Sequence, residues 1–214
     1  MKFLILIFAL ISVTRAVTLN CTFQMRSSTN LPSTYSCYPA TLSNINETET
    51  LTAVYGSHMS GKSNADVGYL LINYVQSLTF FPNGIENFFP NLTAIEIHTC
   101  NISTLNGHEL DAFNNLRWFG IANQPQLERI PGNLFSNTPL VHFVTLHSNN
   151  IKHVGYNVLS SLPLLSYAEF AVNYCVDQSA YTSSQLPSLI ANLRTNCIDI
   201  EQPTTTTTTT TEVP

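Results

Sequence analysis

A chain of 214 residues with 44% hydrophobic side chains is long enough for one ordinary domain or a short repeat array, and too short for two large domains. Only 10% of the residues are charged, and eight Lys and Arg stand against thirteen Asp and Glu, which gives a formal net charge of -5. This balance provides no basic surface for phosphates or anionic lipids, so it argues against nucleic-acid and peripheral-membrane binding.

The N-terminus has the pattern of a secretory signal peptide over residues 1–16. Lys2 precedes an apolar run over 3–13, and the small residues Thr14 and Ala16 follow at the cleavage positions. This run is too short to span ~30 Å of hydrocarbon as a helix, and no later stretch is apolar enough, so we expect no transmembrane segment and a secreted, extracellular protein. Disulfides and N-glycosylation are then allowed. The candidate glycosylation sites are Asn20, Asn46, Asn91 and Asn101.

An L-x-x-L-x-L frame recurs five times along the chain, with starts 24 or 25 residues apart. Its apolar positions are Val67, Leu70 and Ile72; Leu92, Ile95 and Ile97; Leu116, Phe119 and Ile121; Val141, Val144 and Leu146; and Leu165, Ala168 and Phe170.

Further positions keep the same register. A polar or small residue recurs shortly after each frame from the second onwards: Cys100, Gln124, Asn149 and Asn173. Val75 occupies this position in the first unit, which is therefore degenerate. The returning side of the units carries a second apolar set: Ile85, Leu110, Phe135 and Leu159, with Phe88, Phe113, Thr138 and Leu162 three residues later.

This periodicity predicts an α/β leucine-rich-repeat solenoid, with four clear repeats and one partial repeat over 67–174. Each unit makes one short strand and returns by an irregular or helical segment, and stacked units bury what one unit cannot. The strands should form a parallel sheet on the concave face. Inward carboxamides of Asn149 and Asn173 should satisfy backbone groups of adjacent coils. An ordinary amphipathic α/β domain, the alternative, would not keep so many positions in register.

The regions on either side of the repeats are predicted to be caps, over 17–66 and 175–202. We expect the disulfides Cys21–Cys37 and Cys175–Cys197 and a buried thiol at Cys100, although five cysteines allow other pairings, including an intermolecular one. A β-prone run at 51–55 should belong to the N-terminal cap. Helical spacing predicts an apolar face over the last coil, formed by Leu186, Leu189, Ile190 and Leu193. A Thr-rich tail, 203–214, should be extended and open to O-glycosylation.

Some motifs suggest catalysis or metal binding, but we expect neither. Residues 56–63 fit the phosphate-binding loop pattern, yet the first repeat strand follows where that loop needs a helix. His98 and His147 should lie on one sheet face, about 10 Å apart, which is too far to share a metal. No arrangement of nucleophile, base and acid is evident, so we expect no enzyme activity, no catalytic residues, no cofactor and no metal.

The outer face of the sheet is the predicted binding surface. It concentrates aromatic residues beside charged ones, as protein-binding surfaces do. The alternative is that some of these rings turn sideways and only shield the sheet. The candidate ligand-binding residues are Tyr69, Arg117, Trp118, His142, Phe143, Tyr167 and Glu169.

The chain resembles the short secreted leucine-rich-repeat proteins of insects such as midges and mosquitoes, over nearly all of its length after residue 16. The resemblance is strongest at 61–67 (GKSNADV), 87–92 (NFFPNL), 130–135 (IPGNLF) and 149–155 (NNIKHVG). It implies an extracellular recognition module for a protein or glycoprotein, with a role in innate immunity or cell-surface signalling. Mosquito leucine-rich immune proteins, which are functional analogues, pair through a coiled coil and an extra cysteine, but this chain has no heptad segment for such a coiled coil. A structural glycoprotein of matrix, cuticle or secreted silk is the alternative function.

Overall fold

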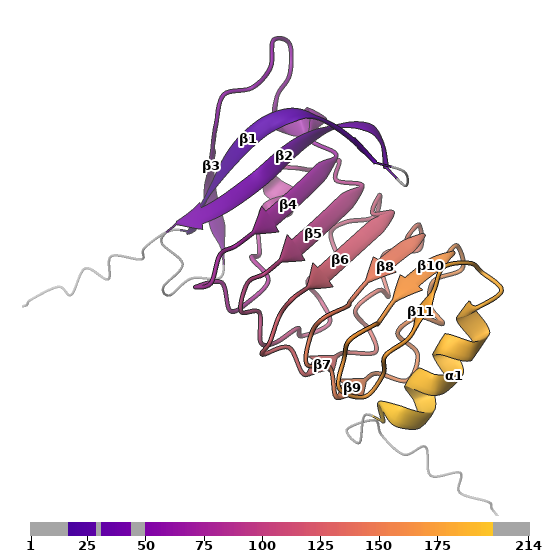
Figure 1. Cartoon of the computed structure of the whole chain (residues 1–214). Helices are drawn as coiled ribbons and strands as arrows, with labels where there is room; N and C mark the ends of the chain where they lie inside the picture. Colours follow the sequence, from indigo (N-terminus) through magenta and orange to yellow (C-terminus); the bar gives the residue numbers. More distant parts are fainter. Residues whose placement is uncertain (1–16, 29–30, 44–49, 199–214) are drawn as a thin grey trace, which may run out of the picture.

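The computed structural model describes residues 17–28, 31–43 and 50–198, which form a solenoid of stacked coils (Figure 1). A row of short parallel strands runs along one side, a long hairpin arches over its first strands, and a helix closes the other end. The predicted signal peptide, the sequon at Asn46, the end of the C-terminal cap and the Thr-rich tail lie outside the described residues.

A nine-stranded sheet contains one strand from each repeat frame. Its order is β11-β10-β8-β6-β5-β4-β2-β1-β3, and the five repeat strands pair in parallel. The repeat strands are β4 (Tyr69–Asn73), β5 (Ala94–His98), β6 (Trp118–Ala122), β8 (Phe143–Thr145) and β10 (Tyr167–Glu169). On the returning side, β7 (Arg129–Ile130) and β9 (His153–Val154) form a small second sheet.

The repeated apolar positions form the core of the solenoid. Every position of the five frames is buried, and none is more than 8% exposed. On the returning side Ile85, Leu110 and Phe135 are buried as expected, but Phe88 is only half-buried. Its neighbour Phe89 is fully buried instead, because a 3-10 turn over Ile85–Asn87 shifts the inward position by one residue.

The predicted carboxamide ladder is present between adjacent coils. Gln124 Nε2 donates to the carbonyls of Ile97 (3.2 Å) and Ala122 (2.9 Å). Asn149 Oδ1 accepts the Gln124 N–H (2.8 Å), and Asn149 Nδ2 donates to the carbonyls of Ile121 (2.9 Å) and Leu146 (3.0 Å). Asn173 repeats the pattern one coil later, donating to the carbonyls of Leu146 and Phe170. These side chains therefore satisfy backbone groups where the coils turn inward.

Each coil turns at a residue of left-handed backbone conformation. Among the described residues, those other than glycine with positive φ are Tyr74, Thr99, Asn123, Ser148 and Val172, each directly before the ladder position of its coil. Positive φ is costly for ordinary residues and most costly for a β-branched one such as Val172. The repeated geometry, and not the local residue type, sets this turn.

The N-terminal cap is a hairpin of β1 (Val17–Ser28) and β2 (Leu31–Ser43), with β3 (Leu51–Tyr55) on its far edge. The Cys21–Cys37 disulfide joins the two hairpin strands, and β2 pairs in parallel with β4. The strand at 51–55 was expected, but the hairpin was not. A period-two pattern could have revealed it, because alternate residues are buried along β1: Val17, Leu19, Cys21 and Phe23.

The C-terminal cap contains the expected helix and disulfide. Helix α1 (Leu186–Asn196) buries Leu186, Leu189 and Leu193, while Ile190 is half-buried. The Cys175–Cys197 disulfide ties the helix end to the last coil, and Cys100 is a buried free thiol. A short strand not expected from the sequence, β11 (Ser179–Ala180), pairs antiparallel with β10.

Helices are scarcer than the α/β class implies. Over the described ranges α1 is the only α-helix, and the coils return mostly through irregular turns. No helix in these ranges is both long and apolar enough to cross a bilayer.

The segment that matches the phosphate-loop pattern packs on the N-terminal cap. His58 stacks on Phe23 with ring centroids 3.9 Å apart and is 3.0 Å from the Tyr35 hydroxyl. A three-residue 3-10 turn over Asn64–Asp66 follows the segment. This turn is too short to present the N-terminus that binds phosphates in such loops.

Candidate functional site

The register of the sheet aligns the predicted aromatic residues in a single row. Tyr69 pairs with Ala94, Ala94 with Trp118, Trp118 with Phe143, and Phe143 with Tyr167. We call these five residues the aromatic row, in which Ala94 is the one member without a ring. Because side chains alternate along a strand, the row points away from the core on every strand.

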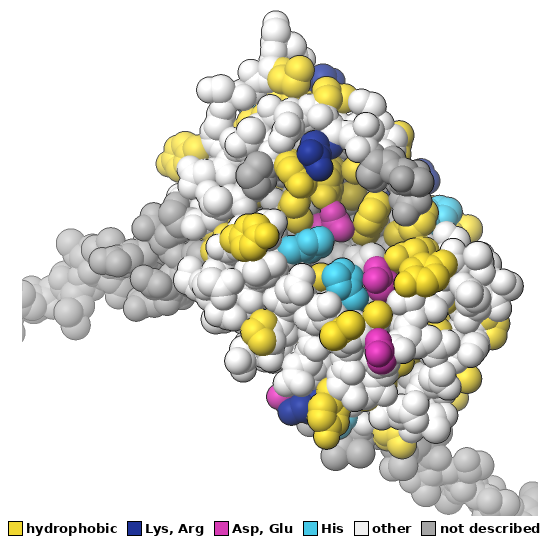
Figure 2. All heavy atoms as spheres, in the orientation of Figure 1, with side chains coloured by type: hydrophobic (Ala, Val, Ile, Leu, Met, Phe, Trp, Pro, Cys, Tyr) yellow, Lys and Arg dark blue, Asp and Glu magenta, His cyan; other side chains and the backbone are white. Residues whose placement is uncertain are grey.

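Three consecutive rings of the row contact one another. The ring centroids of Trp118 and Phe143 are 5.6 Å apart, and those of Phe143 and Tyr167 are 6.0 Å apart, both in tilted geometry. Tyr181, which sequence reasoning missed, extends the series with its centroid 5.5 Å from that of Tyr167. The row therefore forms a continuous apolar strip over the last three repeat strands, and its rings are half-buried (Figure 2).

The hairpin covers the other end of the row. Leu31, where β2 begins, packs in one cluster with Tyr69, Leu71 and Ala94, and Trp118 lies against the edge of that cluster. Tyr69 is only 7% exposed and Ala94 is fully buried, although both belong to the outward row. The structure places Tyr69, one of the predicted ligand-binding residues, beneath the cap, where it lines a smaller pocket of about 290 Å³.

A second row of outward residues contains two carboxylates. Leu71, Glu96, Gly120, Thr145 and Glu169 align across the strands. Glu96 accepts a hydrogen bond from the Tyr69 hydroxyl and lies 3.5 Å from His98 Nε2, and Glu169 accepts one from the Tyr167 hydroxyl (2.9 Å). Glycine at position 120 leaves room for the Thr145 hydroxyl, which a Cβ there would displace.

The two bonded tyrosines resist ionisation. Burial raises the pKa of Tyr69, and the neighbouring Glu96 carboxylate raises it further. The pKa of Tyr167 is raised in the same way, by burial first and then by Glu169. Both hydroxyls therefore remain hydrogen-bond donors at neutral pH, and both are already engaged by a carboxylate.

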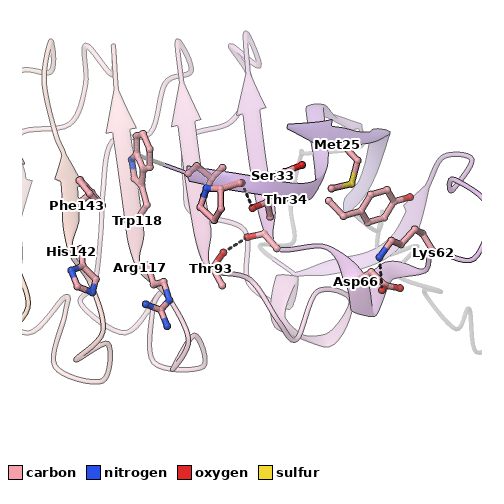
Figure 3. A pocket seen from close by; sticks show the side chains of 14 residues that line it. Met25, Ser33, Thr34, Lys62, Asp66, Thr93, Arg117, Trp118, His142 and Phe143 are labelled. Atoms are coloured by element: carbon pink, nitrogen blue, oxygen red, sulfur yellow. Dashed lines mark hydrogen bonds and ion pairs between the residues drawn. The ribbon is translucent and has the colours of Figure 1, made fainter. Parts of the chain in front are cut away.

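A groove runs between the hairpin and the residues that precede the repeat strands (Figure 3). Its volume is about 670 Å³, and Trp118 and Phe143 lie at the end away from the cap. Arg117 and His142 line it with them, so the structure brings together four of the seven predicted ligand-binding residues. Tyr167 and Glu169 lie one strand further along the sheet, on β10, outside the groove lining.

The indole of Trp118 has an unsatisfied N–H. Its Nε1 is buried and has no hydrogen-bond partner among the described residues, so packing alone orients the ring. An unpaired buried donor costs free energy, and a bound acceptor would remove that cost. The chemistry on offer here is ring stacking, apolar contact and charge-assisted hydrogen bonding. Within residues 17–28, 31–43 and 50–198, no group of three or more His, Cys, Asp or Glu could hold a metal ion.

The sequons that the structure describes differ in exposure. Asn20 and Asn91 are exposed, whereas Asn101 is half-buried. The Asn91 Nδ2 donates to the Ala65 carbonyl (2.9 Å), close to Asp66 at the groove, and Asn101 Nδ2 donates to the Gln76 carbonyl (2.6 Å). A glycan on Asn91 would therefore stand near the cap end of the groove.

Comparison of the chain with protein families and with curated proteins gave no match. No protein-family model matches the chain, and none of the curated proteins matches it either.

Proposed function

We propose that the chain is a secreted leucine-rich-repeat protein that recognises an extracellular protein or glycoprotein through the concave sheet face. The observation that carries this proposal is the half-buried strip of Trp118, Phe143 and Tyr167, three rings in contact on an outward face. Aromatic residues, with Arg beside them, dominate the binding energy of protein interfaces.

Several features support assignment to the leucine-rich-repeat class. The period is 24 or 25 residues, the frame residues are buried, and one strand per unit joins a parallel sheet. A carboxamide ladder and a left-handed turn recur at fixed positions in successive coils. Neighbouring units share each of these features, as expected of a repeat array whose stability comes from contacts between neighbours.

Two disulfides support secretion, because such bonds persist in oxidising compartments. Expression of the full chain in insect cells tests this part directly. We expect the medium to contain a protein that begins at Val17 and loses mass on enzymatic removal of N-linked glycans. A protein retained in the cytosol with an intact N-terminus would contradict the proposal.

Binding is tested by a screen of the purified mature chain against extracellular domains, with the double variant Trp118→Ala/Phe143→Ala in parallel. We expect the variant to lose about tenfold or more in affinity for any partner found, since such anchors contribute most of the binding energy. The control is Tyr174→Ala, which removes an exposed tyrosine outside the row. Equal binding by all three proteins would refute the site.

Deletion of 204–211 separates recognition from the structural alternative. A recognition module should keep its partner without the threonine run. A protein whose incorporation into matrix or silk fails without that run, and which has no partner in the screen, would favour the structural role.

A further inference from the structure

We propose that the groove between the hairpin and the strand starts is a binding site for a small amphipathic acid, with its apolar body against Trp118 and its anionic group at Arg117. This site overlaps the surface proposed for a macromolecular partner at Trp118 and Phe143 and extends from them toward the hairpin. The ligand class follows from the size of the groove, its apolar wall and its single unpaired cation.

The dimensions suit a small molecule. Small-molecule sites usually measure roughly 300–1,000 Å³ and are mostly apolar with few polar groups, and this groove has about 670 Å³. One wall comes from the hairpin and the other from the strand starts, with Trp118 and Phe143 at one end (Figure 3). The apolar and aromatic lining residues are Met25, Leu31, Pro32, Tyr35, Trp118 and Phe143.

The hairpin wall is seated firmly against the sheet. A Cβ at Gly68 would lie 2.7 Å from the Thr34 methyl carbon, so glycine lets β2 pack against the start of β4 without displacing that side chain. The Gly68 N–H donates to the Tyr35 carbonyl (2.8 Å), and the Cys21–Cys37 disulfide holds the hairpin strands together. The groove is therefore preformed, which lowers the conformational-entropy cost of binding.

Most polar groups in the groove already have partners. The Thr34 hydroxyl donates to the Pro32 carbonyl (2.7 Å), and the Thr93 hydroxyl donates to the Gly68 carbonyl (3.0 Å). Lys62 pairs with Asp66 (3.2 Å), whose pKa is lowered by hydrogen bonds from Ser63 and then by Lys62. The positive charge of Lys62 is therefore locally balanced.

Arg117 is the cation left over. Arg117 is exposed, and its side chain has no hydrogen-bond or ion-pair partner among the described residues. Because the chain as a whole is acidic, this charge is a local exception that attracts an anion. Guanidinium binds a carboxylate or sulfonate through two parallel N–H bonds, while the adjacent rings accept an apolar body.

The only tryptophan of the protein lines this groove, so its fluorescence reports directly on occupancy. The probe is 1-anilinonaphthalene-8-sulfonate, an aromatic anion that accepts energy from indole. Its uncharged counterpart, N-phenyl-1-naphthylamine, has a similar aromatic body. We expect saturable quenching of Trp118 by the sulfonate at one molecule per chain, and about tenfold weaker binding of the neutral compound.

Arg117→Gln should weaken sulfonate binding about tenfold and leave binding of the neutral compound unchanged. Lys152→Gln is the matched control, because it removes an equal charge from an exposed ion pair with Glu128, outside the groove lining. Circular dichroism melting of each variant verifies folding. Non-saturable quenching, or equal affinity of Arg117→Gln and the parent chain, would overturn the proposal.

Displacement of the probe shows whether the groove binds small acids or acidic peptides. Competition by decanoate or by indole-3-acetate supports a small-acid site, and displacement by neither contradicts it. An acidic hexapeptide that displaces the probe more strongly than both acids would also contradict it, because the groove would then belong to the macromolecular surface. These results do not depend on finding an extracellular partner.

Discussion

The two halves of the solenoid are held together in different ways. In the N-terminal half the ladder position holds Val75 and Cys100, and the disulfide-tied hairpin covers the sheet from outside. In the C-terminal half the ladder position holds Gln124, Asn149 and Asn173, and among the described residues the hairpin cluster reaches neither Phe143 nor Tyr167.

This difference shows how one repeated sequence pattern can produce a buried outer face in one half of the sheet and a partly exposed outer face in the other. Tyr69 and Trp118 occupy the same register position, yet the first is 7% exposed and the second is half-buried. Between them Ala94 leaves room that Leu31 fills. The strand pattern places side chains on the outer face, and the cap decides which of them meet solvent.

Removal of the N-terminal disulfide should give the largest effect. The variant Cys21→Ala/Cys37→Ala should lose about 3 kcal/mol of unfolding free energy, because the bridge closes a loop with a sequence separation of 16. Urea unfolding followed by Trp118 fluorescence measures the loss. Hydrogen exchange should rise mainly in β1, β2 and β4. Exchange rising equally in β8 and β10 would contradict the division into two halves.

Asn149→Ala interrupts the carboxamide ladder of the C-terminal half. It removes three hydrogen bonds, and the buried Gln124 N–H and Ile121 carbonyl lose their side-chain partner, whereas the Leu146 carbonyl keeps its bond from Asn173, so we expect a loss of about 2–3 kcal/mol. The neighbouring variant Asn150→Ala, which removes only a partly exposed contact with Glu128, is the control. A similar loss in both variants would mean that the ladder contributes little.

Leu31→Ala should partly uncover the N-terminal half at a cost of ~2 kcal/mol, near the lower end for buried leucines because it lies beside the hairpin turn. Tyr69 should become more accessible to solvent, as measured by the rate of its nitration. Leu164→Ala, at an exposed leucine, should change neither stability nor nitration. An unchanged nitration rate in Leu31→Ala would show that another segment covers Tyr69.

A smaller effect is expected at alkaline pH. Folding raises the pKa of Tyr69 and Tyr167 above the ordinary value of 10.0, so the folded state favours their neutral forms. This contribution is fully present below about pH 10 and is lost as the pH rises further. Urea unfolding between about pH 8 and about pH 10.5 should show a smaller decline in Tyr69→Phe and Tyr167→Phe than in the parent chain. An identical decline would contradict these shifts.

The periodic part of the fold was predictable, and the covering of one half was not. Spacing alone identified the frame residues, the ladder at Asn149 and Asn173, and both disulfides, because each depends on local register or on position at an array end. The contact of Leu31 with Ala94 depends on how far a hairpin reaches across the sheet, which local pattern does not encode. Tyr181 was missed for a similar reason, since the cap geometry sets the pairing of β11 with β10.

The contrast between Tyr69 and Tyr167 tests the account most directly. Brief treatment with tetranitromethane, followed by peptide mapping, measures the nitration rate of each tyrosine in the folded protein, with the exposed Tyr74 and Tyr174 as references. We predict that Tyr167 reacts several-fold faster than Tyr69, whose ring lies beneath the hairpin. Equal rates, or faster nitration of Tyr69, would contradict a face divided into a covered half and an open one.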